Sequence, residues 1–205
     1  MKDSEKVIMG IDPGTNLLGF GAISVCGRKL ELVEAGVVDL RAEKDHFCKL
    51  ALIAREFAML LDRIHPDELS IESAFYAKDA QVIQKLGRVQ GIIISEAIRR
   101  CIPVYEYAPR KAKIAVTGNG AASKEQVAMM VGRQLKMDLQ PKHLDATDAL
   151  AIALCHYYDA LSPLGGSSSS GGWKKFIAAH PDRVKLKSRD FGEEFQNFGL
   201  LPFIS

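Results

Sequence analysis

The chain has 205 residues, a length that suits one catalytic domain of about 150 to 170 residues followed by a tail. Apolar residues make up 47% and charged residues 25%, which is typical of a soluble globular protein. The formal net charge of +2 is too small to indicate a nucleic-acid binder, so any contact with DNA must come from local clusters of basic residues.

The cysteines and the N-terminal segment predict a reducing compartment. Cys26, Cys48, Cys101 and Cys155 are far apart and form no C-x-x-C pair. We therefore expect buried thiols rather than a disulfide or zinc framework. The first apolar run spans only about six residues, too few for a signal peptide or a membrane span. Together these features predict a cytoplasmic protein.

The first forty residues predict three strands. Residues 7–12 form a continuous apolar run, and the turn-forming residues 13–16 lead to a second strand at 18–25, which is rich in small residues. A hairpin turn at Gly27 and Arg28 then leads into a third strand at 30–40.

Helices and strands alternate in the rest of the chain. A 3.6-residue apolar period from Leu50 to Ile64 predicts a helix that ends before Pro66. Ser123 and Gln126 fit a capping box at the start of a later helix. The remaining expected elements are strands at 69–72 and 103–107 and helices at 79–100, 110–117, 123–136 and 145–161. This order predicts an α/β fold with a five-stranded mixed sheet flanked by helices.

The composition changes beyond residue 161. We expect a catalytic domain at 1–161, a Gly/Ser-rich linker at 162–172 and a basic C-terminal extension at 173–205. Trp173 and Phe176 are interleaved with basic residues in the extension. This pattern suits either a contact with a phosphate backbone or the packing of the tail onto its own domain.

Four carboxylates occupy positions that indicate a cation site. Asp12 and Glu72 each end an apolar strand, at the rim where open α/β sheets place their active sites. Asp145 and Asp148 are three residues apart and share one face of the last helix. Carboxylates crowded together without a cation would repel one another and raise each other's pKa values. The quartet is therefore typical of the metal centre of a nuclease.

Three of the four acids also have a purely structural interpretation. Asp12 could stabilise the turn that follows it. Glu72 could be a solvated strand end, and Asp148 could be a first-turn acid that complements the helix dipole. His143 lies beside the last pair, but a single histidine next to a loop is more often a surface residue, so we leave it out of the expected ligand set.

Several segments together resemble the RuvC family of Holliday junction endonucleases, which have the ribonuclease H-like fold. The resemblance covers roughly residues 6 to 160, and residues 162–205 extend past the family core. The segments that carry it are 9–15, 71–78, 86–91, 105–110, 124–127 and 145–153.

The resemblance implies roles for individual residues. The family's metal ligands match Asp12, Glu72, Asp145 and Asp148, which would hold two Mg²⁺ ions per active site, with Mn²⁺ as a substitute. Lys124 matches a catalytic lysine, although it could be only an exposed residue of a capped first turn. The implied DNA-binding residues are Phe75, Lys78, Arg110, Lys111 and Lys113. Phe75 would act on unpaired bases at the junction centre, whereas an aromatic residue at this position could also belong to the core.

The resemblance implies a homodimeric endonuclease that resolves four-way junctions by paired symmetric nicks. A two-fold junction matches a dimer with two active sites, and a branch-migration helicase complex of the RuvA and RuvB type is the implied partner. Two alternatives remain open. Residues 11–15 also resemble the first phosphate loop of sugar kinases and actin-like ATPases, and the chain could be a non-catalytic junction-binding module.

Overall fold

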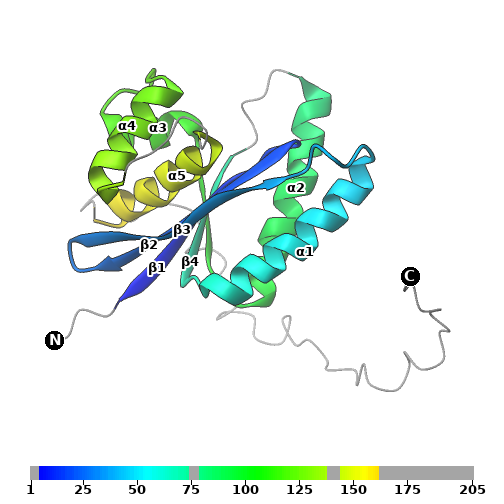
Figure 1. Cartoon of the computed structure of the whole chain (residues 1–205), viewed down its shortest axis with the longest axis horizontal. Coiled ribbons are helices and arrows are strands. Elements are labelled where there is room, and N and C mark those ends of the chain that lie inside the picture. Colours follow the sequence, from blue (N-terminus) through cyan, green and yellow to red (C-terminus); the bar gives the residue numbers. More distant parts are fainter. Residues whose placement is uncertain (1–4, 74–78, 138–143, 162–205) are drawn as a thin grey trace, which may run out of the picture. The chain divides into compact units, whose positions relative to one another are not determined.

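The computed structural model describes residues 5–73, 79–137 and 144–161. Within these ranges, five strands form one mixed sheet in the order β3-β2-β1-β4-β5 (Figure 1). β1, β2 and β3 are antiparallel neighbours, whereas β4 and β5 run parallel to β1. The strands are β1 (Lys6–Asp12), β2 (Leu17–Cys26), β3 (Lys29–Asp39), β4 (Glu68–Glu72) and β5 (Val104–Tyr107). The α/β class and the five-stranded mixed sheet are as predicted.

Two helices cover one face of the sheet, α1 (His46–Ile64) and α2 (Ala80–Arg99) (Figure 1). The side chain of Asp45 caps α1 by accepting a hydrogen bond from the amide of Cys48. This cap starts the helix one turn before Leu50, the first apolar residue of the period seen in the sequence. His65 ends α1 in the left-handed conformation, with φ 49°, directly before Pro66.

Three helices cover the other face: α3 (Pro109–Thr117), α4 (Lys124–Leu135) and α5 (Leu144–Leu161) (Figure 1). α5 is the central helix of this layer, and most of its side chains from Ala146 to Tyr157 are buried. α4 begins with the capping box expected from Ser123 and Gln126. The two larger hydrophobic clusters, one on each face, fix the sheet between the helix layers.

The main chain of α5 lies directly on glycines of β1 and β2. A Cβ atom added to Gly10 would lie 2.0 Å from the main-chain oxygen of Ala149, and one added to Gly19 would lie 2.3 Å from that of Asp145. Since real Cβ atoms do not come so close to main-chain oxygens, only glycine allows this approach. The small residues of the first two strands therefore determine how near α5 lies to the sheet.

Buried polar side chains hold the C-terminal half of α5. His156 Nε2 lies 2.6 Å from a carboxylate oxygen of Glu68 in β4, and its Nδ1 lies 2.7 Å from the hydroxyl of Tyr107 in β5. Lys6 of β1 forms an ion pair with the same carboxylate of Glu68. These bonds connect α5 directly to β4 and β5, and Glu68 extends the network to β1. Such buried polar groups are tolerated because each has a partner.

The expectation of buried cysteines is wrong for three of the four. Cys26 ends β2, Cys48 lies in the first turn of α1, and Cys101 follows α2; all three are exposed. Cys155 of α5 is buried, as expected. The spacing of cysteines in the sequence excludes a zinc motif, but it does not show whether a residue at the end of a strand or helix points to solvent. For this reason the three exposed cysteines were wrongly predicted to be buried.

Two other expectations concern the chain as a whole. Of the helices in the described ranges, none has a stretch long and apolar enough to cross a membrane. The last described helix ends at Leu161. The linker at 162–172 and the basic extension at 173–205 lie outside the described residues, so the domain boundaries stay a prediction.

Candidate active site

Asp12 and Glu72 leave the sheet side by side. β1 and β4 are parallel neighbours, and their paired registers end at Ile11 and Ile71, one residue before each acid. Parallel strands end at the same edge of a sheet, so the two carboxylates come to the rim where this class of fold places its active sites. Asp12 is the last residue of β1, and Glu72 is the last residue of β4.

Asp145 and Asp148 reach the same rim from the first turn of α5. Gly19 of β2 pairs with Asp12 of β1, and the main-chain oxygen of Asp145 lies above Gly19. The Cβ position of Gly19 is also 3.4 Å from Cβ of Asp12. The glycine contact therefore brings the start of α5 to the end of β1. The helix dipole offsets part of the repulsion between acids in this first turn.

The three aspartates form a compact cluster. One carboxylate oxygen from each of Asp12, Asp145 and Asp148 lies within 4.8 Å of the other two. Lys124, the first residue of α4, places its Nζ 2.6 Å from Oδ2 of Asp148 and 3.3 Å from Oδ1 of Asp145. Three elements of the chain, β1, α4 and α5, thus meet at one group of charges.

Burial and the repulsion of neighbouring acids raise the pKa values of two of these carboxyl groups, Asp12 and Asp148. Burial raises the pKa of Asp12 to about 7, with repulsion from Asp148 and Asp145 adding to the shift and Lys124 opposing it. Burial also raises the pKa of Asp148, although its bond to Lys124 offsets part of the rise. Excess negative charge in a partly buried site is the state that a cation would relieve.

Glu72 belongs to the same electrostatic site but lies outside the compact cluster. Burial raises the pKa of Glu72 to about 8, and the charges of Asp12 and Asp148 contribute to this rise. Lys124 and Lys113 act in the opposite direction. The interpretation of Glu72 as a solvated strand end does not fit a carboxyl group that is partly buried and faces other acids.

Lys124 is not a simple exposed residue of a helix terminus. Burial alone would lower the pKa of its ammonium group, but the hydrogen bond to Asp148 and the charges of Asp12 and Asp145 outweigh burial and raise it. Lys124 is therefore a fixed positive charge at neutral pH, held against two of the four acids.

The donor set fits a hard divalent cation. Mg²⁺ prefers carboxylate and water oxygens at about 2.1 Å, so ligand oxygens on opposite sides of one ion lie about 4.2 Å apart. The three aspartate oxygens lie within 4.8 Å of one another, which is near the separation of two ligands on opposite sides of one such ion. Asp12, Asp145 and Asp148 could hold one cation directly. The carboxyl group of Glu72 is close enough that, in addition to burial, the charges of Asp12 and Asp148 raise its pKa.

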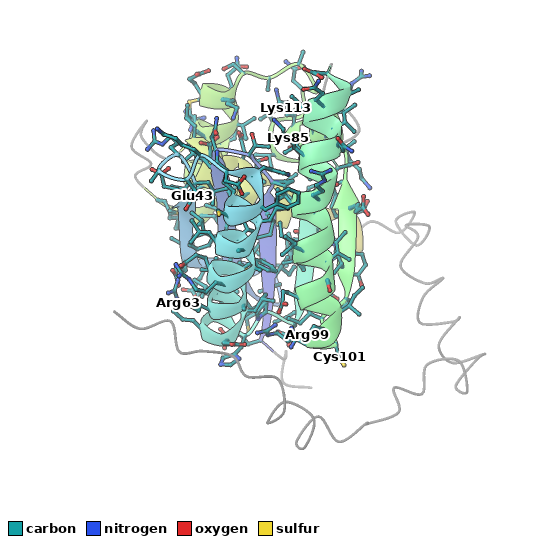
Figure 2. The ribbon with its side chains drawn as sticks, turned by 90° about the vertical axis from the view of Figure 1, so that its right-hand side faces the viewer. Glu43, Arg63, Lys85, Arg99, Cys101 and Lys113 are labelled. Carbon is teal, nitrogen blue, oxygen red and sulfur yellow. The ribbon has the colours of Figure 1, made fainter. Side chains whose placement is uncertain are left out.

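The basic residues expected to contact DNA are not all near the acids. Lys113 of α3 donates a hydrogen bond from Nζ to the main-chain oxygen of Ala122, 2.8 Å away, and its charge acts on Glu72 and Asp148. Figure 2 shows Lys113 and Lys85 toward the same end of the molecule, opposite to the end where Arg63 and Arg99 lie.

Arg110 and Lys111 lie at the start of α3. The side chain of Arg110 is exposed and packs against Gly120 in the loop before α4. The ammonium group of Lys111 is paired with Asp159 at 2.7 Å and lies over the ring of Tyr107. Asp159 is fourteen residues after Asp145 along α5, or about 21 Å at 1.5 Å per residue. The structure therefore places Lys111 away from the acid cluster, whereas Phe75, Lys78 and His143 lie outside the described residues.

Two side chains that the sequence did not single out hold the acid-bearing strand ends. Lys49 of α1 donates from Nζ to the main-chain oxygen of Thr15, 3.0 Å away, in the turn after Asp12. Gln90 of α2 donates from Nε2 to the main-chain oxygen of Glu72, 2.6 Å away. Gln90 could have been noticed in the sequence as a polar residue on the apolar face of a helix, but its partner could not.

Comparison with known proteins agrees with this geometry. Residues 8–156 match the family model for crossover junction endodeoxyribonuclease RuvC. The chain belongs to the RuvC family. The RuvC of Cytophaga hutchinsonii is 45% identical over 184 residues, which cover 90% of each chain. The RuvC of Bacteroides fragilis is 47% identical over 184 residues, covering 88% of this chain and 97% of the relative.

A solved RuvC structure has the same fold. Thermus thermophilus RuvC in complex with a Holliday junction substrate aligns with a TM-score of 0.66 and 32% identity, covering 76% of this chain and 95% of that chain. The ribonuclease H-like fold and the RuvC resemblance are therefore confirmed. These comparisons do not favour the kinase-like or actin-like alternative, because the matches cover nearly the whole length of dedicated junction nucleases.

Proposed function

We propose that this RuvC family protein resolves four-way Holliday junctions in DNA recombination and repair, as a structure-selective endonuclease that makes paired symmetric nicks. The observation that carries the proposal is the convergence of Asp12, Asp145 and Asp148 at the sheet edge, with Lys124 bonded to two of them. A non-catalytic junction binder would gain nothing from a partly buried acid cluster facing phosphates, so the acids favour catalysis.

The proposed metal ligands are Asp12, Glu72, Asp145 and Asp148. Mg²⁺, with Mn²⁺ as a substitute, would supply neutralisation of the charge that develops on the oxygens of the attacked phosphodiester, and two ions per site suit that task. The protein's contribution is geometric: two strand ends and one helix turn hold carboxylate oxygens at fixed positions before any substrate arrives. The raised pKa values of Asp12 and Glu72 support a site shaped for positive charge.

Lys124 and Lys113 are the proposed cationic groups beside the reacting phosphate. Lys124 bridges Asp145 and Asp148 and can turn to a phosphate oxygen when cations take over the carboxylates. Lys113 is tied to Ala122, two residues before Lys124, so the two lysines are linked through the loop that precedes α4. This linkage supports a shared role near the scissile bond.

The remaining DNA contacts are proposed from the family resemblance and from exposure. Arg110 is exposed beside the loop before α4 and is placed to contact a phosphate. Phe75 and Lys78 follow the strand that carries Glu72, and we expect Phe75 to act on unpaired bases at the junction centre. Lys111 would contact DNA only at a distance from the acid cluster, because it is paired with Asp159.

We propose that the protein acts as a homodimer through the open face of α2. Among the described ranges 5–73, 79–137 and 144–161, a Cβ atom added to Gly87 or Gly91 would meet nothing within 4 Å. Glycine within a helix is destabilising by about 0.5–1 kcal/mol relative to alanine, and packing among the residues that the structure describes does not explain these two glycines. Close approach of a second copy would explain them, and a two-fold dimer presents two active sites to a two-fold junction.

The biological setting follows from the substrate. Because a resolvase must meet recombining chromosomal DNA, we propose a cytoplasmic location and a branch-migration helicase complex of the RuvA and RuvB type as the partner. Support for both comes from the family to which the chain belongs.

The decisive experiment is incubation of the purified protein with a synthetic mobile four-way junction, with and without Mg²⁺. We expect paired nicks at symmetric positions only in the presence of the cation. Linear duplex of the same sequence is the control for structure selectivity. Cleavage of that duplex at a similar rate, or cleavage of the junction in the presence of a chelator, would contradict the proposed function.

A further inference from the structure

Gln90 is a buried polar residue on the inner face of α2. It is 8% exposed, and the other buried side chains of this helix are apolar. A buried amide group is tolerated only when it is hydrogen-bonded. The amide nitrogen of Gln90 donates to the main-chain oxygen of Glu72 at 2.6 Å, a short bond. The polar group on this apolar face is therefore directed at the residue that carries a candidate metal ligand.

The bond lies where the pairing of β4 with β1 ends and only β5 remains beside it. The paired register with β1 ends at Ile71. Beyond it, the amide of Ser73 donates to the main-chain oxygen of Tyr107 at 2.9 Å, and Gln90 binds the oxygen of Glu72 itself. The peptide group that follows Glu72 is thus held by one strand contact through its N–H and by one helix side chain through its oxygen. The orientation of this peptide group helps to determine where the Cα–Cβ bond of Glu72 points.

We propose that Gln90 is a positioning residue for Glu72, fixing the end of β4 so that the carboxylate of Glu72 faces the three aspartates. The inference rests on the proposed function of Glu72 as a metal ligand. Gln90 itself does not touch substrate. It acts through the main chain of Glu72, and it makes the placement of this acid depend on the placement of α2.

The kinetic test compares two substitutions of the same kind on one helix. Gln90→Met keeps the length of the side chain and removes the donor. Gln84→Met makes the same change at an exposed position of α2. We expect the single-turnover cleavage rate at saturating junction and fixed Mg²⁺ to fall at least about tenfold for Gln90→Met, since a displacement of about 1 Å can cost about 100-fold. Junction affinity in the absence of divalent cations should stay within about twofold of wild type.

Two readouts do not depend on cleavage. Hydrogen exchange of the Ser73 amide should accelerate in Gln90→Met and not in Gln84→Met, because the strand end is released on one side. Mn²⁺ affinity, measured by calorimetry in the absence of DNA, should fall several-fold in Gln90→Met alone. If Gln90→Met does not fold, Gln90→Glu replaces it, since it keeps the shape of the side chain and exchanges the donor for an acceptor.

The variant Glu72→Gln distinguishes failure of the positioning role of Gln90 from failure of the proposed function of Glu72. If Glu72→Gln is inactive while Gln90→Met cleaves like Gln84→Met with unchanged exchange at Ser73, the positioning role is refuted and the proposed function stands. If Glu72→Gln still cleaves near the wild-type rate, the proposed role of Glu72 fails, and the positioning role fails with it. A reduced rate in Gln90→Met without faster exchange at Ser73 or weaker Mn²⁺ binding also overturns the inference.

Discussion

Individual carboxylates are the groups on which cleavage should depend. Asp12→Asn, Glu72→Gln and Asp145→Asn each remove one negative charge from the acidic site while keeping the size of the side chain. Charge stabilisation by a bound cation is worth several kcal/mol, so we expect the cleavage rate to fall by at least about 100-fold in each variant. Junction binding should be retained, because less negative charge faces the phosphates.

The measurement pairs gel-based cleavage with a binding titration in the presence of a chelator. Asp62→Asn, at an exposed residue of α1 that is paired with Arg100, serves as the control and should cleave normally. Near wild-type nicking by any one of the three acid variants would remove that residue from the catalytic set.

The same residues predict a pH dependence in the metal-free protein. Burial raises the pKa of Asp12 to about 7 and that of Glu72 to about 8, above the unfolded values near 4. A carboxyl group with a raised folded-state pKa favours the folded state at low pH, and this contribution is lost as pH rises through the folded pKa. The melting temperature without divalent cations should therefore decrease from about pH 5 to pH 8.

Mg²⁺ should reverse this trend, because it binds the ionised carboxylates and competes with protons. We expect Mg²⁺ affinity to rise between about pH 6 and pH 8 and protons to be released on binding. Calorimetry in buffers of different ionisation enthalpy measures the release. Asp12→Asn should release fewer protons, and an affinity independent of pH would show that these carboxylates are not the ligands.

At the scale of elements, the contact between α5 and the glycines of β1 and β2 positions half of the acid quartet. Gly19→Ala would place a Cβ atom 2.3 Å from the main-chain oxygen of Asp145, and neither main chain can move without disturbing the sheet or the helix. Overpacking of this kind typically costs about 1–3 kcal/mol of unfolding free energy. The start of α5 should also move away from Asp12, so cleavage by the folded fraction should fall.

Denaturant unfolding and single-turnover cleavage test both parts of this prediction. Gly36→Ala is a suitable control, because its nearest neighbour is the ring of Phe20 at 2.9 Å rather than main chain. It should affect stability without the same decrease in cleavage. Full activity and stability in Gly19→Ala would show that the close approach is not needed to bring Asp145 to the site.

At the scale of the whole molecule, the open face of α2 is the expected dimer contact. Gly91→Leu adds a large side chain where no described residue lies within 4 Å of an added Cβ atom. The folded subunit should tolerate it, whereas a closely packed interface should not. We expect sedimentation to shift from dimer to monomer with little change in far-ultraviolet circular dichroism. A variant that remains fully dimeric would place the interface elsewhere.

The C-terminal extension offers a second prediction at this scale. Residues 173–189 contain one acid, Asp182, and six basic residues. The basic residues are Lys174, Lys175, Arg183, Lys185, Lys187 and Arg189. If the extension binds phosphates, a protein ending at Leu161 should bind junctions more weakly. The logarithm of its binding constant should also fall less steeply with the logarithm of the salt concentration. The slope should be shallower by about 0.9 for each phosphate that the extension neutralises. Unchanged affinity and slope with a lower melting temperature would mean that the tail packs onto its own domain.

The sequence by itself determined the elements and the identity of the acids. Apolar periods, the turn at Gly27 and the capping box at Ser123 are local features, and their free energies are decided within a few residues, so the boundaries were predicted closely. Asp12 and Glu72 were recognised because they end strands, and Asp145 and Asp148 because they share a helix face.

Only the tertiary structure decided which of these groups meet. The distance between Asp12 and Asp145 depends on α5 lying on Gly10 and Gly19, a contact between segments more than a hundred residues apart. The partner of Gln90, the ion pair that holds Lys111 away from the acids, and the exposure of three cysteines have the same origin. Such contacts are fixed by the packing of distant elements, and no local pattern in the sequence encodes them.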